Sequence, residues 1–233
     1  MPANTLSKTA TRWASSSPGP QWSLLESGAY QYKSCANDSD DFTLTPVVEQ
    51  YCIWATNGAS QTLTRCSRDA LSTPHAIELR VETISGSDTG QHMTFEVLGK
   101  AEECLNKVQY QVEEECIQWR REAATELVAL PLPRNAIILP LMRNFLGKVI
   151  CETAERTDGS APIVVPELAH PHSPSVFTPT VETRKATAMP ESSLTIQLAN
   201  KSWDCQAYRF VGGPYDHRST FWICKNTQRL IRY

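Results

Sequence analysis

Asn135-Ala-Ile-Ile-Leu-Pro-Leu-Met-Arg-Asn-Phe-Leu-Gly-Lys-Val-Ile150 is the most apolar window of the chain, and its pattern decides the fold that we expect. Pro140 suits the first position of a helix, because the N–H that it lacks would have no partner there. After it, apolar residues recur in pairs every four positions, which is typical of an amphipathic helix. The pairs are Leu141/Met142, Phe145/Leu146 and Val149/Ile150. We therefore predict a helix at about 140–151, with this stripe laid against an apolar partner.

The composition indicates a globular protein of ordinary size. The 233 residues suit one sizeable domain or two small ones, and we expect one, over residues 21–233. Hydrophobic residues make up 41% of the chain and charged residues 20%, so it can bury a core and is not wholly disordered. The net charge is −3 and there is no basic patch, which favours neither nucleic-acid binding nor attraction to anionic membranes.

The first 20 residues contain no apolar run that could serve as the core of a signal peptide, and we expect a disordered tail there. Their Ser-rich, basic and acid-free character also fits an organelle-transit segment. Pro140, Arg143 and Lys148 interrupt the apolar window well short of the length of a membrane span. We expect a cytoplasmic protein without stable membrane insertion.

Eight cysteines are spread along the chain without a Cys-x-x-Cys pair, a pattern that does not fit a zinc site. An exported chain could pair them as disulfides. Without a signal segment, reduced thiols that act as small hydrophobes are the simpler interpretation. Burial is the expected role of those that fall in strand candidates, because no catalytic base accompanies them in the sequence. These are Cys52, Cys116, Cys205 and Cys224.

Alternation of apolar and polar residues predicts strands over much of the remaining chain. Val47–Ala55 and Gln61–Arg65 flank Asn57-Gly58, which is a strong hairpin signal because both residues tolerate positive φ. We expect a second hairpin from Ala76–Ile84 and Met93–Leu98.

Residues 101–130 contain no Gly or Pro and allow two interpretations. Apolar residues at three- and four-residue spacing fit a helix. Alternation within Lys107–Val112 and Cys116–Arg121 fits two strands. We favour the strands, since Tyr110 and Ile117 would face solvent on the helix.

The C-terminal third continues the strand pattern. Its strand candidates are Pro162–Pro166, Thr180–Ala188, Leu194–Leu198, Trp203–Val211, Ser219–Cys224 and Arg229–Tyr233. The first of these suits a sheet edge, because proline cannot donate to a ladder. Short connections make sequential strands neighbours, and a long sheet must curl. We therefore expect a β-dominated α+β fold: one curved antiparallel sheet, an open or half barrel, with the helix against its concave face.

A family resemblance supports this fold. Phe221-Trp-Ile-Cys-Lys-Asn-Thr-Gln-Arg-Leu-Ile-Arg-Tyr233 resembles the last hairpin of open half-barrel proteins of the LolA/LolB lipoprotein-carrier type and their relatives of unknown function. Tyr30-Gln-Tyr32 after Gly28 is similar to their opening strand. The resemblance implies a concave antiparallel sheet that shelters a lipid or acyl chain. The chain departs from that family in its many cysteines, and we expect no export signal.

Three hypotheses for the function follow. The first is a non-enzymatic binding or carrier protein that holds a hydrophobic, lipid-like ligand between sheet and helix. The second is an enzyme that acts on a hydrophobic small molecule through a histidine and a nearby carboxylate. The third is a structural or partner-binding domain with a fully packed core. We favour the first, with these ligand-binding residues: Leu141, Met142, Phe145, Leu146, Val149, Tyr208 and Trp222.

Polar loops hold the remaining candidates. Glu167, His170 and His172 could offer ligands to a metal, but such spacing is more common in exposed loops. Asp216 and His217 could form an acid/base pair, but adjacent residues seldom aim at one substrate, which favours a polar turn. We therefore expect no metal, no cofactor and no catalytic residue.

Overall fold

The computed structural model describes residues 13–35, 42–58, 60–69, 76–86, 90–122, 124, 126–198, 200–213 and 219–233. The chain divides into two compact units. Unit 1 comprises Met1–Pro131 with Leu168–Phe177, and unit 2 comprises Leu132–Glu167 with Thr178–Tyr233. Each is built on a largely antiparallel sheet, so the β-dominated class is confirmed. The expected single curved sheet is wrong, because the strands of the described residues fall into two sheets. A single domain over 21–233 stays a prediction.

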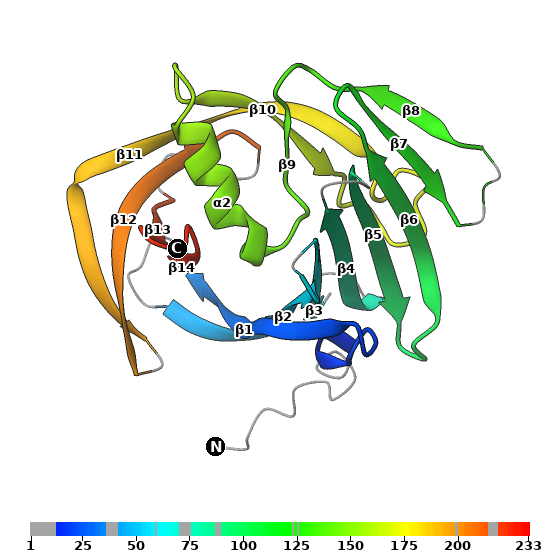
Figure 1. Ribbon diagram of the computed structural model, residues 1–233, viewed down its shortest axis with the longest axis horizontal. Helices are drawn as coiled ribbons and strands as arrows, with labels where there is room; N and C mark the ends of the chain where they lie inside the picture. The colour runs from blue at the N-terminus through cyan, green and yellow to red at the C-terminus, as the bar shows by residue number, and fades with distance from the viewer. Residues whose placement is uncertain are drawn as a thin grey trace. The chain divides into compact units, whose positions relative to one another are not determined.

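In unit 1, the described residues form an eight-stranded meander in which each strand pairs antiparallel with the next one in the chain. Figure 1 shows this order as a colour sequence from blue to green. It follows from short connections, which make sequential strands neighbours. The strands are β1 (Trp22–Cys35), β2 (Phe42–Thr56), β3 (Gln61–Asp69), β4 (Ala76–Gly86), β5 (Gly90–Gly99), β6 (Cys104–Val112), β7 (Cys116–Arg121) and β8 (Val128–Pro131).

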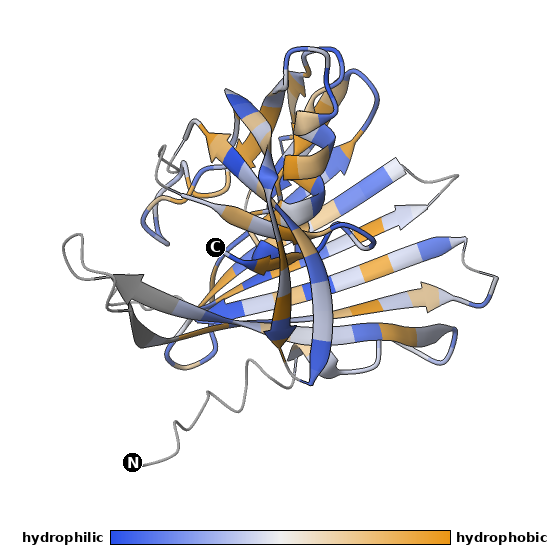
Figure 2. Cartoon of the chain, turned by 90° about the vertical axis from the view of Figure 1, so that its left-hand side faces the viewer, coloured by the Kyte–Doolittle hydropathy of each residue, from blue (hydrophilic) through white to orange (hydrophobic). Residues whose placement is uncertain are grey.

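Both predicted hairpins are confirmed. β2 pairs with β3 across the turn that contains Asn57 and Gly58, and Gly58 adopts a φ of 93°. β4 pairs with β5 so that Val81 faces Phe95, and both side chains are fully buried. Orange and blue bands alternate along several strands in Figure 2, as expected of strands with one apolar face.

Residues 104–121 form strands, so the helical alternative is wrong. β6 pairs with β7, and the Glu113 N–H donates to the Cys116 carbonyl oxygen across their turn at 2.9 Å. Tyr110 and Ile117 are only 1% and 0% exposed, whereas a helix would have turned both toward solvent. Burial of these two large side chains explains why the strands form.

The segment Leu168–Phe177 packs against the apolar face of this sheet. The ring of Phe177 lies 5.6 Å from that of Phe95, which in turn lies 4.8 Å from the ring of Tyr110. The Tyr110 hydroxyl donates to the Phe177 carbonyl oxygen, and burial raises the pKa of Tyr110. The core of unit 1 therefore includes a segment that is distant in sequence from its strands.

Residues 13–15 form a helical turn within the stretch that is predicted to be a disordered tail. Ala14 is 1% exposed, and the ring of Trp13 stacks on the Arg65 guanidinium. The predicted tail therefore extends too far, because these two side chains find contacts in unit 1. Residues 1–12 lie outside the described part of the chain.

The described part of unit 2 forms a six-stranded sheet in the order β14-β13-β12-β11-β10-β9, together with helix α2. Pairing is antiparallel except between β9 and β10, which are parallel. β11 and β12 are long, strongly bent ribbons in Figure 1. The elements are β9 (Ile137–Ile138), α2 (Arg143–Ala154), β10 (Ser160–Pro166), β11 (Pro179–Leu198), β12 (Lys201–Val211), β13 (Phe221–Cys224) and β14 (Leu230–Arg232).

Two strand predictions in unit 2 need correction. Pro162–Pro166 is not an edge strand, because β10 lies between β9 and β11. β9 pairs with just two residues between the prolines, so neither proline has to donate to it. Thr180–Ala188 and Leu194–Leu198 are parts of one strand, β11, with a register shift between the two parts.

Helix α2 begins at Arg143 rather than at about residue 140. The Leu139 N–H still donates to a carbonyl oxygen of β10, so the chain remains part of the sheet at this point. Leu141 then adopts a φ of 59° and Met142 is extended. Pro140 therefore precedes the turn into the helix instead of occupying its first position.

Candidate functional site

The apolar stripe of α2 is largely buried. The helix contacts β9, β10, β11 and β14 of its own unit. Met142, Leu146 and Val149 are 1%, 1% and 4% exposed, whereas Leu141 and Phe145 are half-buried. Three of the five predicted ligand-binding residues in this region are therefore covered by protein, as core residues are. Their role in ligand binding stays a prediction.

Gly147 brings the backbone of α2 directly against β14. A Cβ atom at this position would lie 2.6 Å from the backbone nitrogen of Leu230 and closer still to the carbonyl oxygen of Gln228. Interiors packed this tightly hold no further atoms. No ligand fits between this turn of the helix and β14.

Tyr208 and Trp222, the other predicted ligand-binding residues, lie on adjacent strands. Ala207 faces Trp222 and Tyr208 faces Phe221 where β12 pairs with β13. Paired residues share a face and successive residues alternate, so Tyr208 and Trp222 project from opposite faces of the sheet. Tyr208 is hydrogen-bonded to Cys151 of α2, and burial raises the pKa of Tyr208 to about 12. The structure thus joins Tyr208 to the helix side and separates it from Trp222.

A polar hollow of about 190 Å³ lies on unit 1, on a sheet face that the sequence reasoning did not single out. The register aligns charges from strand to strand, so that Arg80 faces Glu96 and Glu96 faces Lys107. In the sequence, the polar face that lines the hollow is indicated by a polar residue at every second position of three neighbouring strands. The lining residues are Trp13, Arg80, Glu82, Thr94, Glu96, Lys107 and Gln109.

Ion pairs neutralise much of the charge around the hollow. Arg65 Nε lies 2.7 Å from Glu82 Oε2. Lys107 Nζ lies 2.9 Å from Glu96 Oε1. The hydrogen bond to Glu96 raises the pKa of Lys107, so the amine stays protonated at neutral pH and is a poor base or nucleophile.

The indole of Trp13 forms one wall of the hollow between two guanidinium groups. The Arg65 and Arg80 guanidinium carbons lie 5.3 and 5.2 Å from the ring centroid. Arg65 also donates to the Ser16 carbonyl oxygen at 3.1 Å. These contacts hold residues 13–16 on the sheet. The hollow can hydrogen-bond a small polar group, but its charged walls do not suit an alkyl chain.

The loop candidates do not assemble into a metal site. His170 and His172 lie in the Leu168–Phe177 segment with ring centroids 5.6 Å apart, and the His172 N–H donates to His170 Nδ1 at 3.3 Å. Glu167 belongs to unit 2. Among the described residues, no group of three or more His, Cys, Asp or Glu side chains could hold a metal ion. The acid/base candidates at 215–217 lie outside those residues.

Comparison with known proteins finds a distant structural likeness. No family model matches the chain, and no curated protein matches it. A crystal structure of a β-barrel-like protein of the domain of unknown function DUF1849, from Brucella abortus, matches with a TM-score of 0.48 and 8% identity. The match covers 84% of this chain and 85% of that one. A likeness of this degree says nothing about a site. The resemblance to LolA/LolB-type proteins stays a prediction.

The helices of the described residues are too short or too polar to cross a bilayer.

Proposed function

We propose that the chain is a non-enzymatic binding protein for a hydrophobic, lipid-like ligand, and that unit 2 holds this ligand. The observation that supports the proposal is a row of apolar side chains at the C-terminal end of β11. Leu194 and Leu198 are 44% and 52% exposed, and Ile196 between them is half-buried. These three apolar residues at alternate strand positions supply the apolar area that binding of an alkyl chain requires.

The register of β11 with β12 places this row on one face. Ile196 faces Trp203, and Leu198 faces Lys201. Alternation puts Thr195 and Gln197 on the opposite face. The four steps along the strand from Leu194 to Leu198 cover roughly 13 Å, so the row is a narrow track bordered by an indole ring.

The chemistry of this track favours an amphiphile with an anionic head. Lys201 is exposed at the Leu198 end, where its ammonium group can pair with a carboxylate. Complete coverage of one leucine contributes roughly 1.5–3 kcal/mol, so an acyl chain along the row gains affinity from area alone. A long-chain fatty acid combines both features.

The first test is native mass spectrometry of the purified full chain, followed by solvent extraction and identification of anything released. We expect a co-purifying acyl compound, or thermal stabilisation of the delipidated chain by a long-chain fatty acid. A clean apo mass together with no stabilisation by fatty acids or phospholipids would contradict the proposal.

Matched variants locate the ligand. Leu194→Asp with Leu198→Asp should weaken fatty-acid binding by at least about tenfold, since two apolar contacts are lost and two like charges face the head group. Thr195→Asp with Gln197→Asp adds the same charges to the opposite face of the same strand and should leave affinity nearly unchanged. Equal losses in both variants would count against the apolar row.

The predicted contacts at α2 offer a separate position for the same ligand. Leu141, Phe145 and Tyr208 keep some exposed surface there. Loss of binding in Leu141→Ala with Phe145→Ala, but not in the β11 variant, would move the site to the helix.

A partner-binding domain is the second candidate. The burial of Met142, Leu146 and Val149 favours it, because buried residues of this kind on the apolar stripe of α2 are typical of a protein core. An exposed apolar row also suits a protein surface. Failure of the lipid tests with an intact fold would favour this candidate.

A further inference from the structure

Cys205 and Cys224 lie directly opposite each other on β12 and β13. The Lys225 N–H donates to the Asp204 carbonyl oxygen at 2.9 Å, which makes the cysteines a non-hydrogen-bonded pair of the antiparallel ladder. At such pairs the Cα atoms are about 4.5 Å apart and the side chains approach closely on one face. Disulfides need Cα separations of roughly 4.4–6.8 Å. The two backbones therefore already have the spacing of a cross-strand disulfide.

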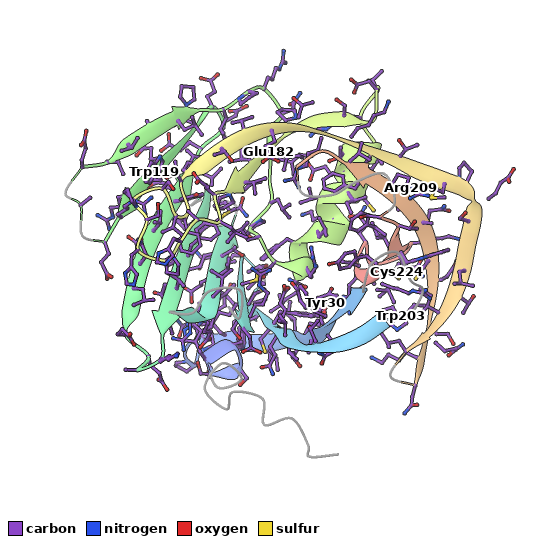
Figure 3. All side chains as sticks on the ribbon, turned by 180° about the vertical axis from the view of Figure 1, so that it is seen from behind. Tyr30, Trp119, Glu182, Trp203, Arg209 and Cys224 are labelled. Atoms are coloured by element: carbon purple, nitrogen blue, oxygen red, sulfur yellow. The ribbon has the colours of Figure 1, made fainter. Side chains whose placement is uncertain are left out.

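A tight turn surrounds the sulfur of Cys224 with hydrogen-bond donors. The Cys224 N–H donates to the Arg229 carbonyl oxygen at 2.9 Å, and the Gln228 N–H donates to the Cys224 carbonyl oxygen at 2.8 Å. This closure directs the hydroxyl and N–H of Thr227, and the N–H of Asn226, toward the sulfur. The Arg229 guanidinium carbon lies 5.6 Å from the centroid of the Trp203 ring, and Figure 3 labels Trp203 and Cys224, which belong to the paired strands β12 and β13.

The two thiols differ in acidity. Burial alone would raise the pKa of Cys224, but the hydrogen bonds from Thr227 and Asn226 and the charge of Arg229 bring it below its usual value. Burial raises the pKa of Cys205 to about 11. A thiolate is the nucleophilic form of cysteine, so Cys224 is suited to attack and Cys205 to follow as a thiol.

We propose that Cys224 and Cys205 form a peroxide-reactive pair that closes a disulfide between β12 and β13. The Cys224 thiolate attacks one oxygen of hydrogen peroxide; an S–O bond forms, the O–O bond breaks and hydroxide leaves. The Cys205 sulfur then attacks the sulfenic sulfur; an S–S bond forms, and the hydroxyl departs as water with the Cys205 proton. Two electrons pass from the two thiols to one peroxide.

The burial of the two thiols limits which oxidants can reach them. Cys205 and Cys224 are 0% and 4% exposed, but residues 225–228, which form the turn over Cys224, are exposed. An uncharged oxidant of the size of water can pass such a turn, whereas a bulky disulfide reagent cannot. The proposal does not depend on a bound ligand.

The test uses the reduced full chain, treated with a modest excess of hydrogen peroxide, alkylated under denaturing conditions and digested without reductant. Mass spectrometry should identify one linked pair of peptides, containing Cys205 and Cys224, lighter by two hydrogens than the reduced pair. Cys66, which is fully buried and whose pKa burial raises well above its usual value, should remain a free thiol as the internal control. Oxidation of the exposed Cys104 without the Cys205–Cys224 link would overturn the proposal.

Variants separate the two roles. Cys205→Ser should accumulate a sulfenic acid at Cys224 that dimedone traps, whereas Cys224→Ser should leave Cys205 reduced. Thr227→Val removes one donor to the sulfur and should raise the pH midpoint of Cys224 oxidation. Below that midpoint, the oxidation rate should fall by up to roughly tenfold for each pH unit by which the midpoint rises. An unchanged pH profile in Thr227→Val, or equal oxidation of Cys205 in Cys224→Ser, would contradict the assigned order.

Discussion

At the scale of single residues, Lys107 illustrates how the charged face of unit 1 is held together. Its ammonium group lies between the carboxylates of Glu96 and Glu122, at 2.9 and 3.8 Å. The nearer pair is mostly buried and gains more from the contact than an exposed pair would. The hydrogen bond with Glu96 is the main cause of the raised pKa of Lys107.

This raised pKa predicts a pH dependence of stability. A lysine whose folded pKa exceeds its usual value of 10.5 stabilises the fold fully below that value, and the contribution is lost as the pH rises through the folded pKa. Glu96→Gln should therefore be less stable than wild type at neutral pH and lose less stability above about pH 10.5. Urea unfolding at a series of pH values measures this. Glu114→Gln, at an exposed turn position, serves as the control and should follow wild type.

At the scale of elements, the contact between α2 and β14 depends on a missing side chain. Gly147→Ala would ordinarily stabilise a helix, because alanine has the higher helix propensity. Here the added methyl group meets the backbone of β14, so the variant should be destabilised by about 1–3 kcal/mol. Denaturant unfolding tests this, with the exposed neighbour Lys148→Ala as control, which should change stability by less than about 0.5 kcal/mol. A Gly147→Ala variant more stable than wild type would show that the helix does not approach β14 this closely.

Local patterns predict the strands well and the helix boundary less well. Alternation in Ala76–Ile84 and Met93–Leu98 is enough for the hairpin of β4 and β5, because each residue needs only a neighbour on the next strand. The late start of α2 depends on the hydrogen bond from Leu139 to β10, a partner that periodicity within the window cannot reveal.

The sites are harder to predict than the strands. To predict the charged hollow, one would need the register of three strands and the contact of Trp13 with the sheet. Trp13 is remote in sequence from the strands that it contacts. Cys205 and Cys224 each resemble buried strand residues when taken singly. Their pairing emerges only from the alignment of β12 with β13.

At the scale of the whole molecule, the chain passes from unit 1 to unit 2, returns for ten residues and enters unit 2 again. The sequence of the returning segment, Leu168–Phe177, is typical of a loop, with prolines and histidines. It has no apolar periodicity that would indicate burial. Its core role comes from contacts such as that between Tyr110 and Phe177, which are 67 residues apart. Periodicity within one segment cannot predict such a contact.

Phe177 therefore tests how much unit 1 depends on this returning segment. Phe177→Ala should destabilise unit 1 by about 3–5 kcal/mol, because a fully buried ring beside Phe95 is lost. Leu168→Ala in the same segment, where the side chain is 59% exposed, should have little effect. Urea unfolding followed by tryptophan fluorescence provides the comparison. Equal midpoints for the two variants would mean that the segment is dispensable for the core.

The edge strands of the two sheets affect how readily copies of the chain aggregate in concentrated solution. Among the described residues, β8, β9 and β14 end their sheets with only four, two and three residues. The fourth terminal strand, β1, is long, but its pairing with β2 is irregular at two places. Short or distorted borders offer few aligned N–H and C=O groups to a strand from another copy. The short strands and the irregular pairing at the edges of the two sheets therefore disfavour aggregation by pairing of strands from different copies.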